Sequence, residues 1–357
     1  MKITFVLPGL SRVPIGGYKV VYQYATSFAE CGNEVTIVHV ENIAYKNKNL
    51  KSLLRNCLIK SHIWGKKNIE WFDFNKSVNI KFVTNLDEKS LPEADAIIAT
   101  SWETAEPVYS LPKKYGKKFY FIQHYEIQHG HKAEVDETWK LPMTNIVIAT
   151  WLKNIGVELG TTCKVVKNFV DSKEYYLTQN VEKRKPSISM LYHEEEWKGS
   201  KDGIKVLNNV LKDFPDIEIR MFGVPERPQN LDSRILYFQN CKPEKLREEV
   251  YNKTSIFLFT SHSEGWGLTA TEAMACGNAL VSTKNGGVLD FGIENETALL
   301  SDIKDIESLT KNVEKLIVND ALRNRLQSSC VKLVSSLTLE NSTKQFLSII
   351  SKDNEKC

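Results

Sequence analysis

Residues 261–288 read SHSEGWGLTATEAMACGNALVSTKNGGV, which predicts a loop, a short helix and a strand in that order. Thr269 or Thr271 can cap the helix, good helix formers extend it, and Gly277 supplies the left-handed residue that ends it. Residues 279–283 predict the strand. A loop, helix and strand in this order are typical of an α/β domain.

Two carboxylates stand out in this stretch. Glu264 and Glu272 lie eight positions apart, the first in a glycine-containing loop and the second in the expected first turn of the helix. The helix dipole and the amides of a first turn stabilise negative charge. Because a carboxylate accepts two hydroxyl hydrogen bonds side by side, both groups could face one polyhydroxylated ligand such as a ribose joined to a sugar. The Gly286 and Gly287 turn that follows the strand lets bare backbone approach a phosphate.

A purely structural interpretation fits the same spacing. In it, the segment is an ordinary strand, loop and helix with solvated acids, and Glu272 only completes a capping box with Thr269. Spacing alone does not decide between the two interpretations.

A family resemblance favours the functional interpretation. Residues 264–287, EGWGLTATEAMACGNALVSTKNGG, resemble the carboxy-terminal signature of the retaining GT-B glycosyltransferases of family 4, in which two glutamates separated by seven residues precede a glycine pair. The resemblance implies an α/β chain of two Rossmann-like βα domains that face each other across a cleft. It also implies a group of donor-binding residues in this segment: Glu264, Gly265, Trp266, Gly267, Leu268, Glu272, Gly286 and Gly287.

The chain before this segment predicts a second series of strands and helices. We expect strands at 187–192, 217–222, 235–238 and 255–259, and helices at 200–212 and 243–252. Helical periodicity dominates from residue 306 onward, with helices expected at 306–318 and 321–334. The resemblance implies that Gly223, at the end of the second of these strands, also contacts the donor.

The turn Trp197-Lys198-Gly199 resembles the family's phosphate-binding lysine and glycine. The resemblance implies that Lys198 is both catalytic and donor-binding. The family's arginine is missing, and His193 occupies its position. Three adjacent acids, residues 194–196, should favour protonation of His193, so that it too carries positive charge to a diphosphate.

The amino-terminal part predicts the opening of a doubly wound parallel sheet. A strand at 2–7, a loop ending in Gly16 and Gly17, a helix at 18–31 and a strand at 34–40 follow one another. A glycine pair at a helix start can offer amides to an anion, although most such pairs are merely turns. The segment resembles the family's amino-terminal pattern, which approaches the donor diphosphate and the acceptor. Further strands are expected at 80–83, 96–100, 118–123 and 145–150.

Three histidines follow the strand at 118–123. Such a group could be a metal site, but it ends a parallel strand, where open α/β sheets place ligands. The resemblance implies that His124 sits beside the transferred sugar as a catalytic residue. We expect His129 and His131 to face solvent, and we expect no metal site.

Composition limits the class of protein. The chain has 357 residues, enough for two domains, and a net charge of +3, which does not suggest a nucleic-acid binder. Its seven cysteines lack metal-ligand spacing, and no window reaches membrane-spanning length, so we expect a cytoplasmic location. An acid-free basic run at 46–67 is interleaved with apolar residues. It predicts either peripheral contact with an anionic membrane at its inner face or a solvated helix packed on its own sheet.

Domain boundaries follow from a further resemblance. Residues 165–171, VVKNFVD, resemble the family's stretch that leads into the interdomain linker. We therefore expect an acceptor-binding domain over 1–170, a linker over 171–186, a nucleotide-sugar-binding domain over 187–336, and a last helix over 337–357 that crosses back to the first domain.

The resemblance implies a retaining glycosyltransferase that acts without a metal ion or other cofactor. Its donor would be a UDP-sugar, or else a GDP- or dTDP-sugar, and its acceptor a glycan or lipid-linked hydroxyl in bacterial surface polysaccharide or glycoconjugate synthesis. The sequence contains no Asp-x-Asp motif for a divalent ion. Two alternatives remain open: a nucleotide-sugar epimerase on the same fold, and a non-catalytic subunit that binds glycan or a partner. The replacement of the family's arginine by His193 favours the second alternative. The retained Glu264, Glu272 and Lys198 argue against it.

Overall fold

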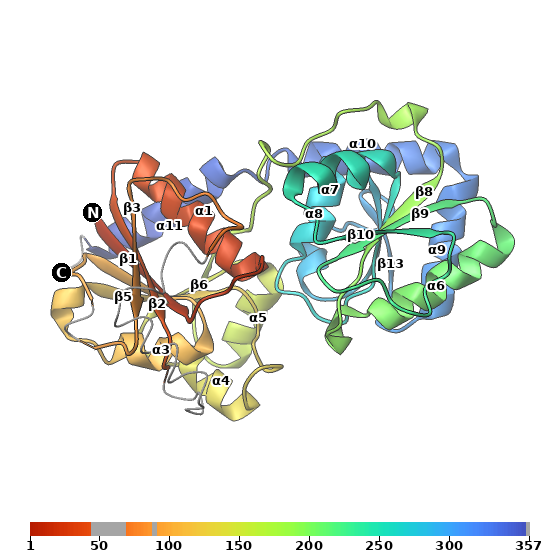
Figure 1. Cartoon of the computed structure of the whole chain (residues 1–357). Coiled ribbons are helices and arrows are strands. Elements are labelled where there is room, and N and C mark those ends of the chain that lie inside the picture. Colours follow the sequence, from red (N-terminus) through yellow and green to blue (C-terminus); the bar gives the residue numbers. More distant parts are fainter. Residues whose placement is uncertain (44–68, 88–90, 355–357) are drawn as a thin grey trace. The chain divides into compact units, whose positions relative to one another are not determined.

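The computed structural model describes residues 1–43, 69–87 and 91–354. The basic run at 46–67 lies outside the described residues. The chain forms two compact units, the first made of Met1–Lys167 together with the chain from Leu339 onward, and the second made of Asn168–Thr338. Each unit is a parallel β-sheet with helices on its faces (Figure 1).

The first unit is built on a seven-stranded sheet with the order β3-β2-β1-β4-β5-β6-β7, in which every neighbouring pair is parallel. Its central strands are apolar because helices cover both faces of the sheet. The strands are β1 (Lys2–Pro8), β2 (Glu34–Val40), β3 (Val78–Val83), β4 (Ala96–Ala99), β5 (Lys117–Ile122), β6 (Thr144–Val147) and β7 (Cys163–Val165).

The helices of the first unit include one from the far end of the chain. They are α1 (Gly16–Glu30), α3 (Trp102–Tyr109), α4 (Lys132–Trp139), α5 (Thr150–Glu158) and α11 (Leu339–Asn354). In Figure 1 the blue α11 lies beside the red α1. Phe346 of α11 is fully buried, with its ring 5.4 Å from that of Phe28 and 5.0 Å from that of Phe121. These contacts join α11 to the core of the first unit.

The second unit repeats the architecture with six parallel strands in the order β10-β9-β8-β11-β12-β13. The strands are β8 (Ser187–Leu191), β9 (Glu218–Gly223), β10 (Ile235–Gln239), β11 (Ile256–Phe259), β12 (Ala279–Thr283) and β13 (Ala298–Ser301). The helices are α6 (Ser200–Asp213), α7 (Pro243–Glu249), α8 (Leu268–Ala275), α9 (Ile306–Val318) and α10 (Asp320–Val334). The predicted pair of Rossmann-like βα domains is therefore confirmed.

Several predicted element boundaries were wrong. Helix α1 begins at Gly16, so Gly16 and Gly17 lie in its first turn and not in the preceding loop. Strand β6 ends at Val147 because helix α5 begins at Thr150, and the short strand β7 that follows was not predicted. Strand β13 and helices α3 to α5 were also missed, since each is too short to show a clear period.

The segment between the last strand of the first sheet and β8 is packed on the second unit. Within residues 171–186, which we expected to be a linker, Tyr175 and Val181 are buried. The guanidinium of Arg184 is buried too, and donates to the main-chain carbonyls of Thr254 at 3.0 Å and Cys276 at 2.8 Å. The second carbonyl belongs to the C-terminal end of α8, where a cation is favourable.

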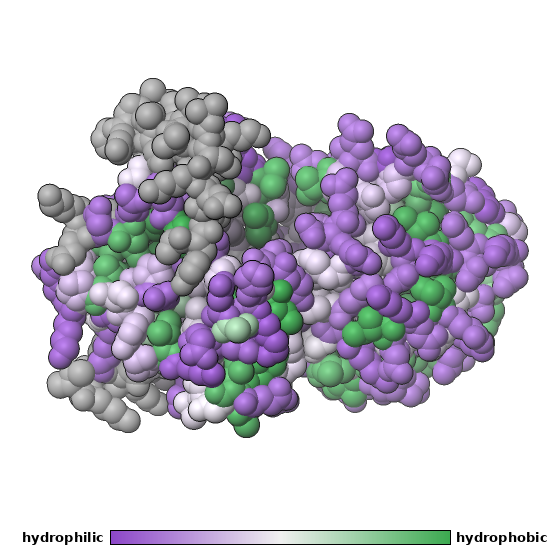
Figure 2. Space-filling model, turned by 90° about the horizontal axis from the view of Figure 1, so that it is seen from below, coloured by the Kyte–Doolittle hydropathy of each residue, from purple (hydrophilic) through white to green (hydrophobic). Residues whose placement is uncertain are grey.

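Polar residues cover most of the face seen in Figure 2, and hydrophobic residues form separate small areas on it. Among the described residues, none of the helices combines the length and the apolar character needed to cross a membrane.

Candidate functional site

A largely buried ion pair lies at the centre of the candidate site in the second unit. Lys198 ends a short 3-10 helix between β8 and α6, and Glu264 lies in the loop between β11 and α8. The Lys198 ammonium is 2.8 Å from Oε1 of Glu264, and the exposed fractions of the two side chains are 18% and 9%. The hydroxyl of Ser261 donates to the same oxygen at 2.7 Å.

The topology of the sheet explains why these two loops meet. Strands β8 and β11 are parallel neighbours, and the order of strands reverses between them. Open α/β sheets bind ligands at this switch point, outside the carboxyl ends of the strands. Lys198 and Glu264 follow the carboxyl ends of these two strands, so the structure brings together the two residues that sequence placed at the diphosphate and the sugar.

The glycine turn after β12 supports the Glu264 loop. The amide of Glu264 donates to the carbonyl of Asn285 at 2.9 Å, and the amide of Gly287 donates to the carbonyl of Glu264 at 3.1 Å. The amide of Gly287, in the turn expected near a phosphate, therefore already has a partner within the protein. A Cβ at position 287 would lie 2.4 Å from the carbonyl oxygen of Trp266, so close packing explains this glycine.

Helix α8 starts differently from the prediction. Its N-cap is Gly267, with φ +108° and no side-chain cap, so neither predicted threonine caps the helix and no capping box forms with Glu272. Glu272 is the fifth residue of the helix, which begins at Leu268, so the prediction that it lies in the first turn was wrong. The carboxylate is half-buried. Burial first, and the negative charge of Glu272 second, raise the pKa of the buried Tyr175 and Tyr251. The carboxylate therefore lies near both phenols.

The remaining donor-site residues of the second unit have mainly supporting positions. Trp266 is 2% exposed, and its ring packs on Phe291 at 5.3 Å, so it holds the loop from inside. Gly265 is buried and Leu268 is half-buried at the start of α8. Gly223 ends β9, where a Cβ would lie 2.4 Å from the carbonyl oxygen of Tyr192.

The predicted protonation of His193 was wrong. Burial first, and the Lys198 ammonium second, lower the pKa of His193, and the neighbouring carboxylates oppose them less strongly. The main-chain amide of Glu195 donates to Nδ1 of His193 at 3.1 Å. The neutral ring therefore carries its hydrogen on Nε2 and can act as a hydrogen-bond donor there.

Sequence analysis missed a second pair in the second unit. Nε2 of His262 lies 2.8 Å from Oδ2 of Asp202, and the exposed fractions of the two side chains are 16% and 15%. His262 is close to Glu264 in sequence, but its partner Asp202 lies 60 positions away, and no spacing rule relates His262 to Asp202.

The predicted residues of the first unit lie at the carboxyl edge of its sheet. The carbonyl of Gly17 accepts a hydrogen bond from Nε2 of Gln123 at 3.0 Å, which joins the start of α1 to the loop after β5. His124 in this loop is half-buried, with Nδ1 3.1 Å from the carbonyl of Tyr125 and its ring 6.0 Å from that of Trp151.

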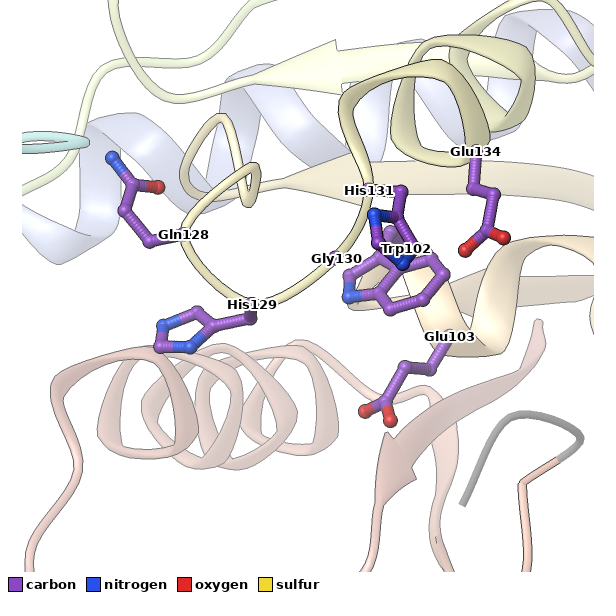
Figure 3. A pocket seen from close by; sticks show the side chains of 7 residues that line it. All are labelled: Trp102, Glu103, Gln128, His129, Gly130, His131 and Glu134. Carbon is purple, nitrogen blue, oxygen red and sulfur yellow. The ribbon is translucent and has the colours of Figure 1, made fainter. Parts of the chain in front are cut away.

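A polar hollow of about 520 Å³ lies beside this loop (Figure 3). In this view the carboxylate of Glu134 lies to the right of the Trp102 ring and that of Glu103 lies below it. His129 and His131 are exposed, as expected, and none of the described residues forms a cluster suited to a metal ion. The hollow is lined by Trp102, Glu103, Gln128, His129, Gly130, His131 and Glu134.

A half-buried glutamate fixes one wall of this hollow. Oε2 of Glu126 accepts a hydrogen bond from the amide of Trp102 at 2.8 Å, at the start of α3. Burial, and to a smaller extent the Glu103 carboxylate, raise the pKa of Glu126 to about 8, and the bond from Trp102 opposes this shift. The carboxyl group therefore joins the loop after β5 to helix α3.

Known proteins resemble this chain in sequence over part of its length. Residues 178–330 match the family model described as glycosyl transferases group 1. The capsular polysaccharide biosynthesis glycosyltransferase CapM of Staphylococcus aureus is 30% identical over 136 residues, 36% of each chain. A D-inositol 3-phosphate glycosyltransferase of Corynebacterium urealyticum is 26% identical over 155 residues, 39% of this chain and 37% of the relative. These matches thus span little more than a third of the curated relatives.

Solved structures resemble the chain over nearly its whole length. Sucrose-phosphate synthase from Thermosynechococcus elongatus has a TM-score of 0.75 at 13% identity and covers 98% of both chains. Anabaena Alr3699/HepE, solved in complex with UDP and glucose, has a TM-score of 0.71 at 14% identity, with 98% of this chain and 99% of the other covered. Residues 178–330 thus resemble the glycosyl transferases group 1 family, and the chain has the GT-B fold.

Proposed function

We propose that this chain is a retaining glycosyltransferase, which moves a sugar from a nucleotide diphosphate donor to an acceptor hydroxyl. The observation that carries the proposal is the Lys198–Glu264 ion pair, buried at the switch point of a sheet and inside the segment that matches the family. A cation and a carboxylate held together at this place suit a ligand with a diphosphate at one end and hydroxyls at the other.

Lys198 faces the departing nucleoside diphosphate in this proposal. A positioned cation lowers the barrier because negative charge on the leaving group grows in the transition state. Neutral His193 adds a hydrogen bond from Nε2, in place of the charge that arginine brings in the family. The chain's own groups supply this stabilisation, and the proposed reaction has no resident metal ion.

Glu264 orients the transferred sugar. Its Oε1 is engaged by Lys198 and Ser261, and its Oε2 has no partner among the described residues. A carboxylate oxygen can only accept, so Oε2 is suited to bind a sugar hydroxyl. Glu272, on the neighbouring helix, binds the ribose hydroxyls. UDP is the first candidate nucleotide, with GDP and dTDP next.

The first unit binds the acceptor in this proposal, with His124 beside the transferred sugar. Carboxylates, imidazoles and an amide line its polar hollow, and all of them can exchange hydrogen bonds with a glycan or the sugar of a lipid-linked acceptor. Synthesis of a bacterial surface polysaccharide or glycoconjugate is the proposed setting, at the cytoplasmic side of a membrane. The CapM relative supports it by its description.

A thermal-shift screen tests the donor assignment. A ligand that binds only the folded chain raises its melting temperature, so one of UDP, GDP and dTDP should raise it clearly more than the corresponding nucleoside does. Release of nucleoside diphosphate that increases on adding an acceptor would then establish transfer. A chain that none of the three nucleotides stabilises would contradict the proposal.

A further inference from the structure

Four contacts join the turn that carries Lys198, and the start of α6 that follows it, to the loop that carries Glu264. The amide of His262 donates to the carbonyl of Trp197 at 2.7 Å. The hydroxyl of Thr260 donates to the carbonyl of Gly199 at 2.9 Å. The other two contacts are the Lys198–Glu264 pair itself and the His262–Asp202 pair, each at 2.8 Å.

Close backbone packing adds to these bonds. Gly199 has φ +64°, and a Cβ at this position would lie 1.9 Å from the carbonyl oxygen of Thr260. The two segments therefore approach each other as closely as glycine permits. Asp202 lies in the first turn of α6, just after this point, so its bond to His262 fixes the start of that helix on the loop.

We propose that His262 and Asp202 are positioning residues, which hold the Lys198 turn against the Glu264 loop so that the ammonium meets the donor diphosphate in one fixed place. The inference rests on the proposed function. Neither side chain touches the donor in this account. They act through Lys198, whose long side chain could otherwise choose among many rotamers.

The pair is well suited to such a role. Both side chains are mostly shielded from water, so their hydrogen bond is screened less than a surface pair. The pair also joins residues on two different elements that leave neighbouring strands. Groups that bind a transition state need support of this kind, because small displacements weaken electrostatic stabilisation.

Calorimetric titrations with UDP and with uridine test the proposal. Uridine lacks the diphosphate, so the ratio of the two dissociation constants measures what the Lys198 region contributes. His262→Ala and Asp202→Ala should each weaken UDP binding about tenfold, the loss expected for a hydrogen bond to a charged group. Uridine binding should stay within about twofold of wild type, a change too small to count as a lost interaction.

Two further variants separate positioning from general damage. His262→Gln can still donate a hydrogen bond to Asp202, and should bind UDP nearly as tightly as wild type. Lys205→Ala removes an exposed lysine 3.6 Å from the other oxygen of Asp202, and should change neither constant. Circular dichroism checks that each variant is folded, and the change at Asp202 keeps the test available if His262→Ala does not fold.

Each result has a distinct meaning. If folded His262→Ala and Asp202→Ala bind UDP as tightly as wild type, or if both lose uridine as well, the positioning role is overturned. The positioning role is also overturned if His262→Gln binds UDP as weakly as His262→Ala does. If GDP or dTDP is the nucleotide that wild type binds, the same titrations use it and its nucleoside. A wild-type chain that binds none of UDP, GDP and dTDP more tightly than the matching nucleoside would instead contradict the proposed function.

Discussion

Replacing Gly199 by alanine should damage the second unit more than a similar change elsewhere. Its φ of +64° disfavours any side chain, and the added Cβ would lie 1.9 Å from the carbonyl oxygen of Thr260. The left-handed backbone costs about 1 to 2 kcal/mol. The collision adds about 1 to 3 kcal/mol, because a backbone oxygen in a packed segment cannot rotate away.

Gly160 provides the matched control. It has φ +76°, and an added Cβ would meet nothing within 4 Å. Gly160→Ala should therefore lose only the backbone part, about 1 to 2 kcal/mol. Urea unfolding followed by circular dichroism measures both variants, and each transition has to be fitted separately because a chain of two units need not unfold in one step.

The two variants should also differ in ligand binding. Gly199→Ala moves the Lys198 turn away from the Glu264 loop, so UDP binding should weaken, whereas Gly160→Ala should leave it unchanged. Equal losses of stability in the two variants, or UDP binding unchanged in Gly199→Ala, would refute the claim that close packing at Gly199 sets the position of Lys198.

Three other predictions concern the two glutamates, a buried histidine and the basic run at 46–67. Glu272→Ala should mainly raise the KM for the donor and Glu264→Ala should mainly lower kcat; wild-type steady-state kinetics in both would show that the roles are misassigned. His39 is fully buried, Nδ1 donates to the carbonyl of Gly9 at 2.7 Å, and burial lowers its pKa to about 4. Since the unfolded chain binds this proton near pH 6.5, stability should fall by about 3 kcal/mol as pH drops from about 6.5 to 4, and urea unfolding of His39→Asn should lack this part of the pH dependence. The segment at 46–67 should bind anionic vesicles at low salt and release them at high salt. If the protein does not sediment with the vesicles at low salt, or still does so after four of the basic residues are neutralised, the membrane interpretation is contradicted.

The parts of the fold that local sequence determines were predicted well. Gly277 has φ +83° and ends α8 as expected, because a left-handed stop depends on the residue itself. The alternation of strands and helices also identified both sheets, since buried parallel strands are continuous apolar runs. The edge strand β7 was missed because three residues give no pattern of their own, and it is defined only by its pairing with β6.

The part of the candidate site that depends on residue type and sequence spacing was predictable. Lys198 and Glu264 were identified and do meet, because parallel strands place their loops at one edge. The start of α8 was not predictable, since Gly267 takes φ +108° where a Cβ would lie 2.8 Å from the Phe259 ring. The charge state of His193 was also misjudged, because burial and Lys198 outweigh acids that are its neighbours in sequence.

Donor consumption by wild type and by Lys198→Met is the most direct test of the central claim. The two proteins are incubated with a panel of UDP-, GDP- and dTDP-hexoses and a mixture of glycan acceptors, and released nucleoside diphosphate is measured. We predict that wild type consumes at least one donor of the panel, and that the variant does so about 10² to 10³ times more slowly, as expected for the loss of one preorganised electrostatic group. Equal rates in the two proteins, or no donor consumed by wild type, would contradict the account.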